Sequence, residues 1–377
     1  MENWKKDGRR DVVLVDLDVL VPANHLLRKI ERGMDYEWLY ERLSPYYCHD
    51  NGRNGTDPVV LVKMVLIQHL FDIPSLRQTY QRIKDTLSYR WFLGYSLLDE
   101  IPHFATVSYA FCKRFPPTRT VECSLRGEHE RQFAYEAHTV CERHGFVLDV
   151  EVTAENVHDS VAWDAIYDRV SEKFDINFVT MDAGYKTPWI AKKVFEGEKL
   201  PILPYTRPKG SKEQYKPWEY QYNSENDTYA CPQGGILRHT TTDRDGKRIY
   251  RSTPKHCVNC PHKKLCGANE KGQKALSRHI WQGYLDLAEQ LRKTEWVRDI
   301  YAMRKQTIER VFGDAKEKHA MRYTQHRGLT RVTQWVRLKY AAMNLKKLAT
   351  WAWNSPRFSR ICLVWMPYIQ RTAVFTT

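Results

Sequence analysis

The stretch "INFVTMDAGYKTPWIAKKVF", residues 176–195, decides the fold. Its first part, "INFVTM", is an apolar run typical of a buried strand, and it ends at a lone aspartate, Asp182. Thr187 followed by Pro188 predicts a helix N-cap with proline at the first helical position. A strand, a short turn and a helix indicate an α/β sheet. Asp182 is therefore either a capping residue or half of a metal site, because ligands of such sheets gather at the carboxyl ends of strands.

The segments around this stretch extend the sheet. "RQFAYEAHTVCER" and "GFVLDVEVT" are predicted strands of a hairpin joined by "RHG". "NVHDSVAWDAIYDRV" predicts a helix capped by Asp159 or Ser160, with Ala162, Ile166 and Val170 as its apolar stripe. "LPILPYT" is a further strand. The order β-β-α-β-α-β predicts a mixed α/β sheet.

The chain changes character four times. Residues 24–115 are predicted to be helical, with Pro58 beginning a helix after the N-cap Asp57. Aromatic residues near basic ones in this region either grip DNA or, as we favour, fill a small helical core. The predicted segments are a helical N-terminal domain, a first part of the sheet, a polar insertion, a helical last part and an unplaced tail: residues 1–115, 116–206, 207–280, 281–353 and 354–377.

The charge balance points to a polyanionic partner. The chain has 59 Lys and Arg against 45 Asp and Glu, a formal charge of +14. This charge is spread along the whole chain, which favours nucleic acid over a merely basic soluble protein. No apolar run approaches the roughly 20 residues that span a bilayer, and the first residues lack a signal sequence. We therefore expect a chain in a reducing cytoplasm, with no membrane partner.

Four of the nine cysteines cluster in the insertion. Their spacing is C-x25-C-x2-C-x5-C, which suits a tetrahedral structural Zn²⁺. Reduced thiols are the alternative. The predicted zinc ligands, with two histidines as substitutes, are Cys231, Cys257, Cys260 and Cys266, and then His256 and His262.

A second acidic candidate lies in "YAMRKQTIERVFGDAKEKH". In this predicted helix Glu309 shares one face with Lys305 and Lys316, at offsets of four and seven residues. Taken alone, such a face is most often an ordinary row of ion pairs. The opposite, apolar stripe that docks the helix is Ile308, Val311, Phe312 and Ala315.

These blocks together resemble a known family. "TMDAGYKT" and "RKQTIERVFGDAKEKHAMRY" resemble the second and third catalytic blocks of bacterial insertion-sequence transposases with a DDE core. The family signature falls on Tyr301, Arg304, Glu309 and Lys316. "LVPANHLLRKI" to "IPHFATVS" resembles the helical N-terminal domain of one branch, and "YACPQG" to "HCVNCPHKKLC" resembles its cysteine-bearing insertion. The resemblance covers residues 12 to about 353.

The resemblance implies a fold and a chemistry. The fold is an RNase H-like core with a helical N-terminal domain, and the cofactor is Mg²⁺ or Mn²⁺ held by Asp182 and Glu309. Mg²⁺ takes oxygen ligands, and two ions can activate the attacking hydroxyl and stabilise the leaving oxygen. The implied partners are the terminal inverted repeats of the element and target DNA, contacted by Lys305, Arg310 and Lys316. A nucleoid-associated bacterial protein is expected, and a homodimer is left open.

The chain departs from the family at its first acidic block. No "(I/V)DATH"-like strand precedes "RQFAYEAH", which we interpret as an internal deletion that removed the first catalytic aspartate. Alternation in "TVECSL" predicts a short substitute strand that "RGEHER" turns back against "QFAYEAH", refilling the slot. Glu122 would then be a surrogate ligand. The function predicted is a transposase impaired in strand cleavage and transfer. Its alternatives are a non-catalytic derivative that competes for element ends, or a zinc-ribbon DNA-binding factor.

A basic helix follows at "TRVTQWVRLKYAAMNLKKLATWAW". Its predicted core residues are Val332, Trp335, Val336, Tyr340 and Met343. The basic residues predicted to face solvent or DNA are Arg331, Arg337, Lys339, Lys346 and Lys347. Solvent is the default for such a face, and only the family context favours phosphate.

Overall fold

The computed structural model describes residues 16–43, 55–107, 123–126, 130–154, 157–207, 214–269, 271–353 and 372–376. The chain divides into two compact units. Unit 1 comprises residues 1–157 and 307–370, and unit 2 comprises residues 158–306 and 371–377. This division differs from the predicted segments, because residues 307–353 belong with the N-terminal helices and the β-hairpin rather than with residues 281–306.

Unit 1 combines helices from both ends of the chain with two hairpins. Its helices are α1 (Leu17–Leu20), α2 (Leu26–Gly33), α3 (Glu37–Leu43), α4 (Pro58–Leu70), α5 (Leu76–Asp85), α6 (Leu87–Leu93), α14 (Ile308–Lys318) and α15 (Leu329–Trp353). Its strands are β1 (Cys123–Arg126), β2 (Glu130–Phe133), β3 (Tyr135–Glu142) and β4 (Val147–Ala154).

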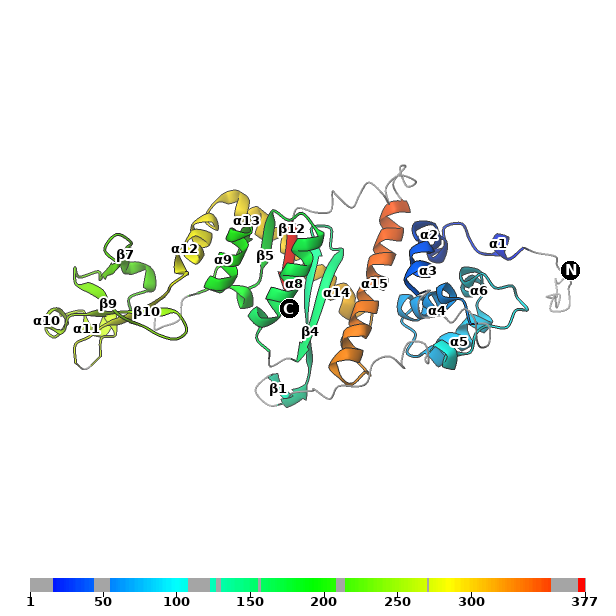
Figure 1. Ribbon diagram of the computed structural model, residues 1–377, viewed down its shortest axis with the longest axis horizontal. Coiled ribbons are helices and arrows are strands. Elements are labelled where there is room, and N and C mark those ends of the chain that lie inside the picture. Colours follow the sequence, from blue (N-terminus) through cyan, green and yellow to red (C-terminus); the bar gives the residue numbers. More distant parts are fainter. Residues whose placement is uncertain are drawn as a thin grey trace, which may run out of the picture. The chain divides into compact units, whose positions relative to one another are not determined.

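Helix α4 forms the centre of the helical part, as predicted. Asp57 accepts a hydrogen bond from the Val59 N–H at 2.7 Å, and Pro58 stands in the first turn. Because α4 is apolar on nearly all sides, neighbours cover it all round. Helix α15 runs alongside α2 and α4 (Figure 1). The shared core includes Leu27, Met64, Ile67, Leu70, Ile83, Phe92 and Ala342.

One prediction for α15 is wrong. Lys339, expected to face solvent or DNA, is 5% exposed and pairs with Asp72 at 2.5 Å. It lies on the side of α15 that packs against the N-terminal helices, so its charge needs a partner inside the protein. The predicted core residues Val332, Val336 and Tyr340 are buried, which confirms that part of the prediction.

The predicted hairpin is confirmed. β3 and β4 are antiparallel, with His138 opposite Glu151. α15 is anchored to this hairpin by two polar contacts. The Thr139 hydroxyl donates to the Tyr340 hydroxyl at 3.1 Å, and the Asn344 amide bonds both the N–H and the carbonyl of Val147, at 3.0 and 2.8 Å.

The substitute strand forms but does not refill the slot. β1 pairs antiparallel with β2, and Cys123 stands opposite Phe133, as the turn "RGEHER" predicts. These two strands form a separate two-stranded sheet. The expected refilling is therefore wrong, because β1 and β2 pair with each other and stand apart from the sheet that contains β5. Glu122 lies outside the described residues.

Unit 2 holds the predicted strand, turn and helix. Its first elements are α8 (Asp159–Lys173), β5 (Phe178–Met181), the 3₁₀ turn η2 (Ala183–Tyr185), α9 (Pro188–Glu196) and β6 (Leu200–Ile202). The later helical elements are α12 (Gln282–Leu291), α13 (Glu295–Ala302) and the 3₁₀ turn η4 (Met303–Gln306), and the last strand is β12 (Thr372–Thr376).

Three parallel strands meet in unit 2. β5 pairs with β6 on one side and with β12 on the other, where Thr372 is opposite Phe178 and Phe375 opposite Met181. The tail, which the sequence left unplaced, thus supplies a strand beside the one that carries Asp182. An antiparallel hairpin in unit 1 and parallel strands in unit 2 confirm the predicted mixed α/β class.

The helix caps in unit 2 are partly as predicted. Thr187 accepts from the Ile190 N–H at 3.3 Å, so α9 begins as expected. Helix α8 is capped by His158, whose Nδ1 accepts from the Ser160 N–H at 3.2 Å, and not by Asp159 or Ser160. The chain is still extended at His158, so the capping acceptor lies one residue earlier than predicted.

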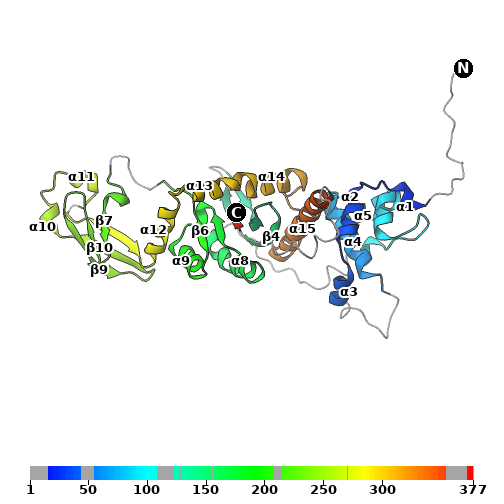
Figure 2. The same cartoon turned by 90° about the horizontal axis from the view of Figure 1, so that it is seen from above.

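The insertion is a five-stranded antiparallel sheet in the order β11-β10-β9-β8-β7. Two short helices lie at the end of the sheet away from α12 (Figures 1 and 2). Its elements are the turn η3 (Pro217–Glu219), β7 (Gln221–Asn223), β8 (Thr228–Ala230), β9 (Ile236–Thr242), β10 (Lys247–Ser252), α10 (Pro254–Cys257), α11 (Lys263–Cys266) and β11 (Ala275–His279). Within the described residues no helix has the length and apolar character that crossing a membrane requires.

The predicted helix around Glu309 is interrupted. Lys305 belongs to η4, whereas Glu309 and Lys316 belong to α14, which begins at Ile308. Thr307 between them has φ −106° and ψ −92°, outside the helical region. The expectation that Lys305 shares a helical face with Glu309 is therefore wrong. The docking stripe is confirmed for Ile308, Val311 and Ala315, which are buried, while its fourth member, Phe312, is half-buried.

Candidate functional site

Asp182 follows the last residue of β5 and holds the turn that comes after it. Its Oδ1 accepts a hydrogen bond from the Ala183 N–H at 2.6 Å, so it caps η2. Its side chain remains 41% exposed. Asp182 is therefore a capping residue, and its carboxylate still has free acceptor positions for a further ligand.

A buried arginine faces the same carboxylate. Arg304 Nη2 lies 3.4 Å from Asp182 Oδ2, and Arg304 Nη1 donates to the Tyr301 hydroxyl at 2.8 Å. Burial alone would lower the pKa of Arg304, but Tyr301 and Asp182 more than offset it, so that this pKa is raised. Three residues singled out in the sequence thus form one connected network in unit 2.

Lys186 fixes the far end of the Asp182 turn. Its Nζ donates to the Pro204 carbonyl at 3.1 Å, to the Thr206 hydroxyl at 2.9 Å, and to the carboxylate of Glu289. Burial would raise the pKa of Glu289, but its bonds to Lys186 and Arg292 outweigh burial and lower it. The turn is therefore tied both to the end of β6 and to α12.

Gly184 in the turn lies against Asp159 at the start of α8. A Cβ at position 184 would stand 1.9 Å from Asp159 Oδ2. No heavy atoms approach so closely without bonding, so only glycine allows the carboxylate to pack here. A second acidic side chain therefore lies beside the turn that begins at Asp182.

The other predicted DNA- and metal-contacting residues are exposed. Glu309 and Lys316 lie on one face of α14, at positions seven residues apart, and Arg310 and Lys305 are exposed as well. Asp182 belongs to unit 2 and Glu309 to unit 1, so their convergence stays a prediction. Among the described residues no three His, Cys, Asp or Glu side chains are grouped to hold a metal ion. The Asp182 carboxylate suits a hard cation, but the residues that the structure describes around it do not supply the further carboxylates of a magnesium site.

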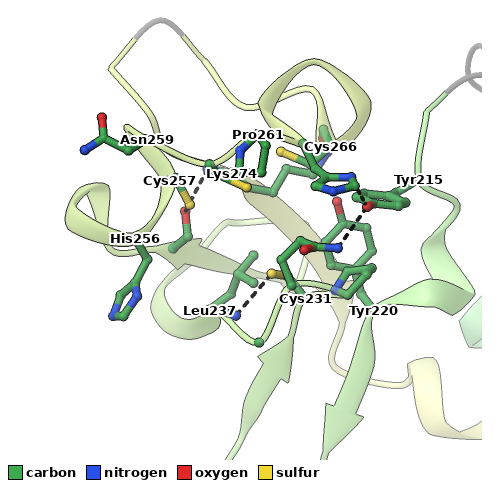
Figure 3. Close-up of a pocket in the computed structure, with 17 residues that line it drawn as sticks. Tyr215, Tyr220, Cys231, Leu237, His256, Cys257, Asn259, Pro261, Cys266 and Lys274 are labelled. Atoms are coloured by element: carbon green, nitrogen blue, oxygen red, sulfur yellow. Dashed lines mark hydrogen bonds between the residues drawn. The ribbon is translucent and has the colours of Figure 1, made fainter.

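The four clustered cysteines line one cavity of about 330 Å³ at the end of the insertion (Figure 3). They are free thiols. Cys231 Sγ accepts from the Gly235 N–H at 3.2 Å, while Cys257 Sγ donates to the Ser252 hydroxyl at 3.2 Å. Cys266 Sγ donates to the Lys263 carbonyl at 3.4 Å. Each of these three sulfurs therefore bonds a neighbour close in sequence rather than another cysteine.

The cavity wall carries two tyrosines, Tyr215 and Tyr220, and the two histidines predicted as substitute ligands, His256 and His262. The Tyr215 hydroxyl lies 2.9 Å from His262 Nδ1 and accepts from the Gln233 amide at 3.3 Å. Burial raises the pKa of Tyr220, and the nearby thiols of Cys266 and Cys231 raise it further. Four thiols facing one cavity are the donor type that Zn²⁺ prefers. The sulfurs would have to turn toward one another to bind it, because they are not grouped at metal distance.

Sequence reasoning missed three contributors to the Asp182 turn: Asp159, Lys186 and Glu289. Lys186 stands in the same quoted block as Asp182, so its nearness was available from the sequence. Asp159 was taken only as a helix cap. Glu289 lies more than 100 residues from Asp182 and had no pattern to mark it.

Two family models match the chain. Residues 15–113 match the model described as Transposase domain (DUF772), and residues 230–349 match the model described as Transposase DDE domain. The second match includes the four clustered cysteines together with Tyr301, Arg304, Glu309 and Lys316. No curated protein and no solved structure matches the chain significantly.

Proposed function

The chain belongs to the insertion-sequence DDE transposases, and from this premise we propose that it binds the terminal inverted repeats of its element and is impaired in metal-dependent strand cleavage and transfer. We further propose that its mixed sheet is an RNase H-like core. Asp182 would be its second acidic position and Glu309 its last.

One observation carries the proposal: the network of Tyr301, Arg304 and Asp182 at the carboxyl end of β5. Tyr301 and Arg304 precede Glu309 by eight and five residues, and the family signature likewise has a Tyr and an Arg ahead of its Glu. Two segments that are separated by more than 100 residues therefore meet through residues of that signature. An ordinary capping aspartate would need neither the arginine nor the tyrosine.

The residues of the network have distinct roles in such a site. Asp182 and Glu309 would hold Mg²⁺ or Mn²⁺, which when bound activates the attacking hydroxyl and stabilises the leaving oxygen. Arg304 donates to Asp182 Oδ2 and so orients the carboxylate. Lys186 and Gly184 hold the turn that follows Asp182 in place. Lys305, Arg310 and Lys316, all exposed, would contact DNA phosphates.

A specific observation favours the second candidate, a non-catalytic derivative that competes for element ends. A three-carboxylate site of the kind that the resemblance implies would need an acid on a strand next to β5, and the two described neighbours of β5, β6 ("LPI") and β12 ("TAVFT"), contain none. A chain that keeps its DNA contacts but lacks one carboxylate would bind ends without cutting them. Zn²⁺ at the four cysteines, as a structural ion of the insertion, is part of both candidates.

The test is a strand-transfer assay on DNA that carries the element's ends, with Mg²⁺ or Mn²⁺. The proposed function predicts weak cleavage that Asp182→Ala and Glu309→Ala each abolish. End-specific binding without any cleavage, seen as a gel shift that both variants retain, supports the second candidate. Absence of end-specific binding contradicts both.

A further inference from the structure

The sheet of the insertion has two chemically different faces. Leu237 and Tyr250 lie on one face, where they form a small core with Tyr220. Since side chains alternate along a strand, the residues between them point the other way. The strand registers place Thr228, Arg238, Lys247, Arg251, Ala275 and Ser277 on this second face, which we call the outer face. None of the strand residues that the structure describes on it is acidic.

Two arginines stand side by side on the outer face. Arg238 of β9 is directly opposite Arg251 of β10, and both side chains are exposed. Like charges directly opposite each other across two strands are destabilising. Their other cross-strand neighbours, Thr228 and Ala275, are small and uncharged. Among the described residues neither arginine has an acidic partner, so nothing there offsets their repulsion.

The arginines on the core face are treated differently. Arg248 Nη1 lies 3.5 Å from Asp227 Oδ2, and Arg278 Nη2 lies 2.7 Å from Asp286 Oδ2. At the edge of the outer face, Lys247 also pairs with Asp245, at 3.5 Å. The other Lys and Arg side chains on the strands of this sheet thus have acidic partners, whereas among the described residues Arg238 and Arg251 have none. Folding does not require such a pair, so binding is the better explanation.

We propose that the outer face of the insertion binds the phosphate backbone of duplex DNA, with Arg238 and Arg251 on the phosphates. The inference rests on the proposed function for its choice of DNA as the polyanion. A guanidinium group can bind two phosphate oxygens at once, and the small cross-strand neighbours Thr228 and Ala275 leave room for a duplex beside the two arginines. Such contacts position the protein on DNA and carry no sequence preference. The phosphate removes the repulsion between the two arginines.

The experiment measures binding of the full chain to a fluorescein-labelled 30-base-pair duplex of mixed sequence, by anisotropy, between 50 and 200 mM salt. The test variant is Arg238→Gln with Arg251→Gln. The matched control is Lys255→Gln with Lys264→Gln, which removes the same charge from exposed positions on α10 and α11. A third variant, Arg238→Lys with Arg251→Lys, keeps the charge.

The test variant should lower the slope of log K against log[salt] by about 2 and weaken binding at 100 mM salt by roughly 50-fold. The control should change binding less than threefold, and the lysine variant should retain most of the affinity. Because a repulsion is removed, the test variant should melt at the same temperature as the parent chain or higher. Equal losses in the test variant and the control, or no loss in either, would overturn the inference. If element ends are still bound with normal affinity by the test variant, the inference fails while the proposed function stands.

Discussion

The Asp182 turn and the cysteine cavity both contain residues that the sequence marked as metal ligands, but unit 2 treats them differently. Around Asp182, a buried arginine contacts the carboxylate, and a lysine and a tightly packed glycine hold the turn that follows it. Around the cavity, the sulfurs of Cys231, Cys257 and Cys266 bond groups within five residues of themselves. Long-range partners thus hold the first site in place, whereas the second offers four thiols that, on our proposal, Zn²⁺ would draw together.

Removal of a cavity cysteine should have the largest effect. If Zn²⁺ gathers the four thiols, its binding contributes about 10 kcal/mol or more to folding of the insertion. We expect about one zinc per purified chain by mass spectrometry, and we expect Cys260→Ser to lose it. Cys141→Ser, a change at a buried cysteine of β3, is the control and should keep the metal. A parent chain free of zinc would contradict this expectation.

Arg304→Ala should cost about 3 kcal/mol in free energy of unfolding. It removes a buried charge that bonds both Tyr301 and Asp182, and it leaves these partners without their donor. Arg298→Ala, at an exposed position of α13, should change stability by less than about 0.5 kcal/mol. Urea unfolding measures both. Equal effects would show that the carboxylate is not held by a network at all.

Gly184→Ala should cost about 1 to 2 kcal/mol, because the added Cβ meets the Asp159 side chain, and either that side chain or the turn has to move. The same change in an Asp159→Ala background should be much milder, since the obstructing atoms are gone. Gly313→Ala on α14, where a Cβ meets nothing, should instead stabilise by about 0.5 to 1 kcal/mol. If Gly184→Ala still lowers stability strongly in the Asp159→Ala background, contact with Asp159 is not the cause.

The smallest effect concerns pH. The pKa of Glu289 is lowered below its ordinary value of 4.5 in the folded chain, so its ion pair with Lys186 stabilises above that pH. The contribution is lost as the pH falls through the folded pKa. Glu289→Gln should therefore cost about 1 kcal/mol at pH 7 and progressively less as the pH falls below 4.5. A cost independent of pH would indicate packing rather than charge.

The sequence correctly predicted those helices, strands and caps that depend on residues close to one another in the chain. The cap at Asp57, the strand before Asp182, the helix after Thr187 and the β3–β4 hairpin all form as expected, because each depends on neighbours a few residues away. The fate of individual charges was harder to predict. The sequence pattern of α15 predicts that Lys339 is exposed, yet it is buried and forms an ion pair with Asp72 from a distant segment.

By itself the sequence determined the element order, the class of fold, the family and the position of Asp182 at the end of a strand. These follow from hydrophobic period, capping residues and spacing, which are properties of short stretches. Only the tertiary structure decided that Arg304 and Glu289 stabilise the Asp182 turn and that β12 completes the parallel strands beside it. It also decided that Arg238 and Arg251 face each other across two strands. The reason is physical: such partners are selected by closeness in space, which the order of residues along the chain does not record.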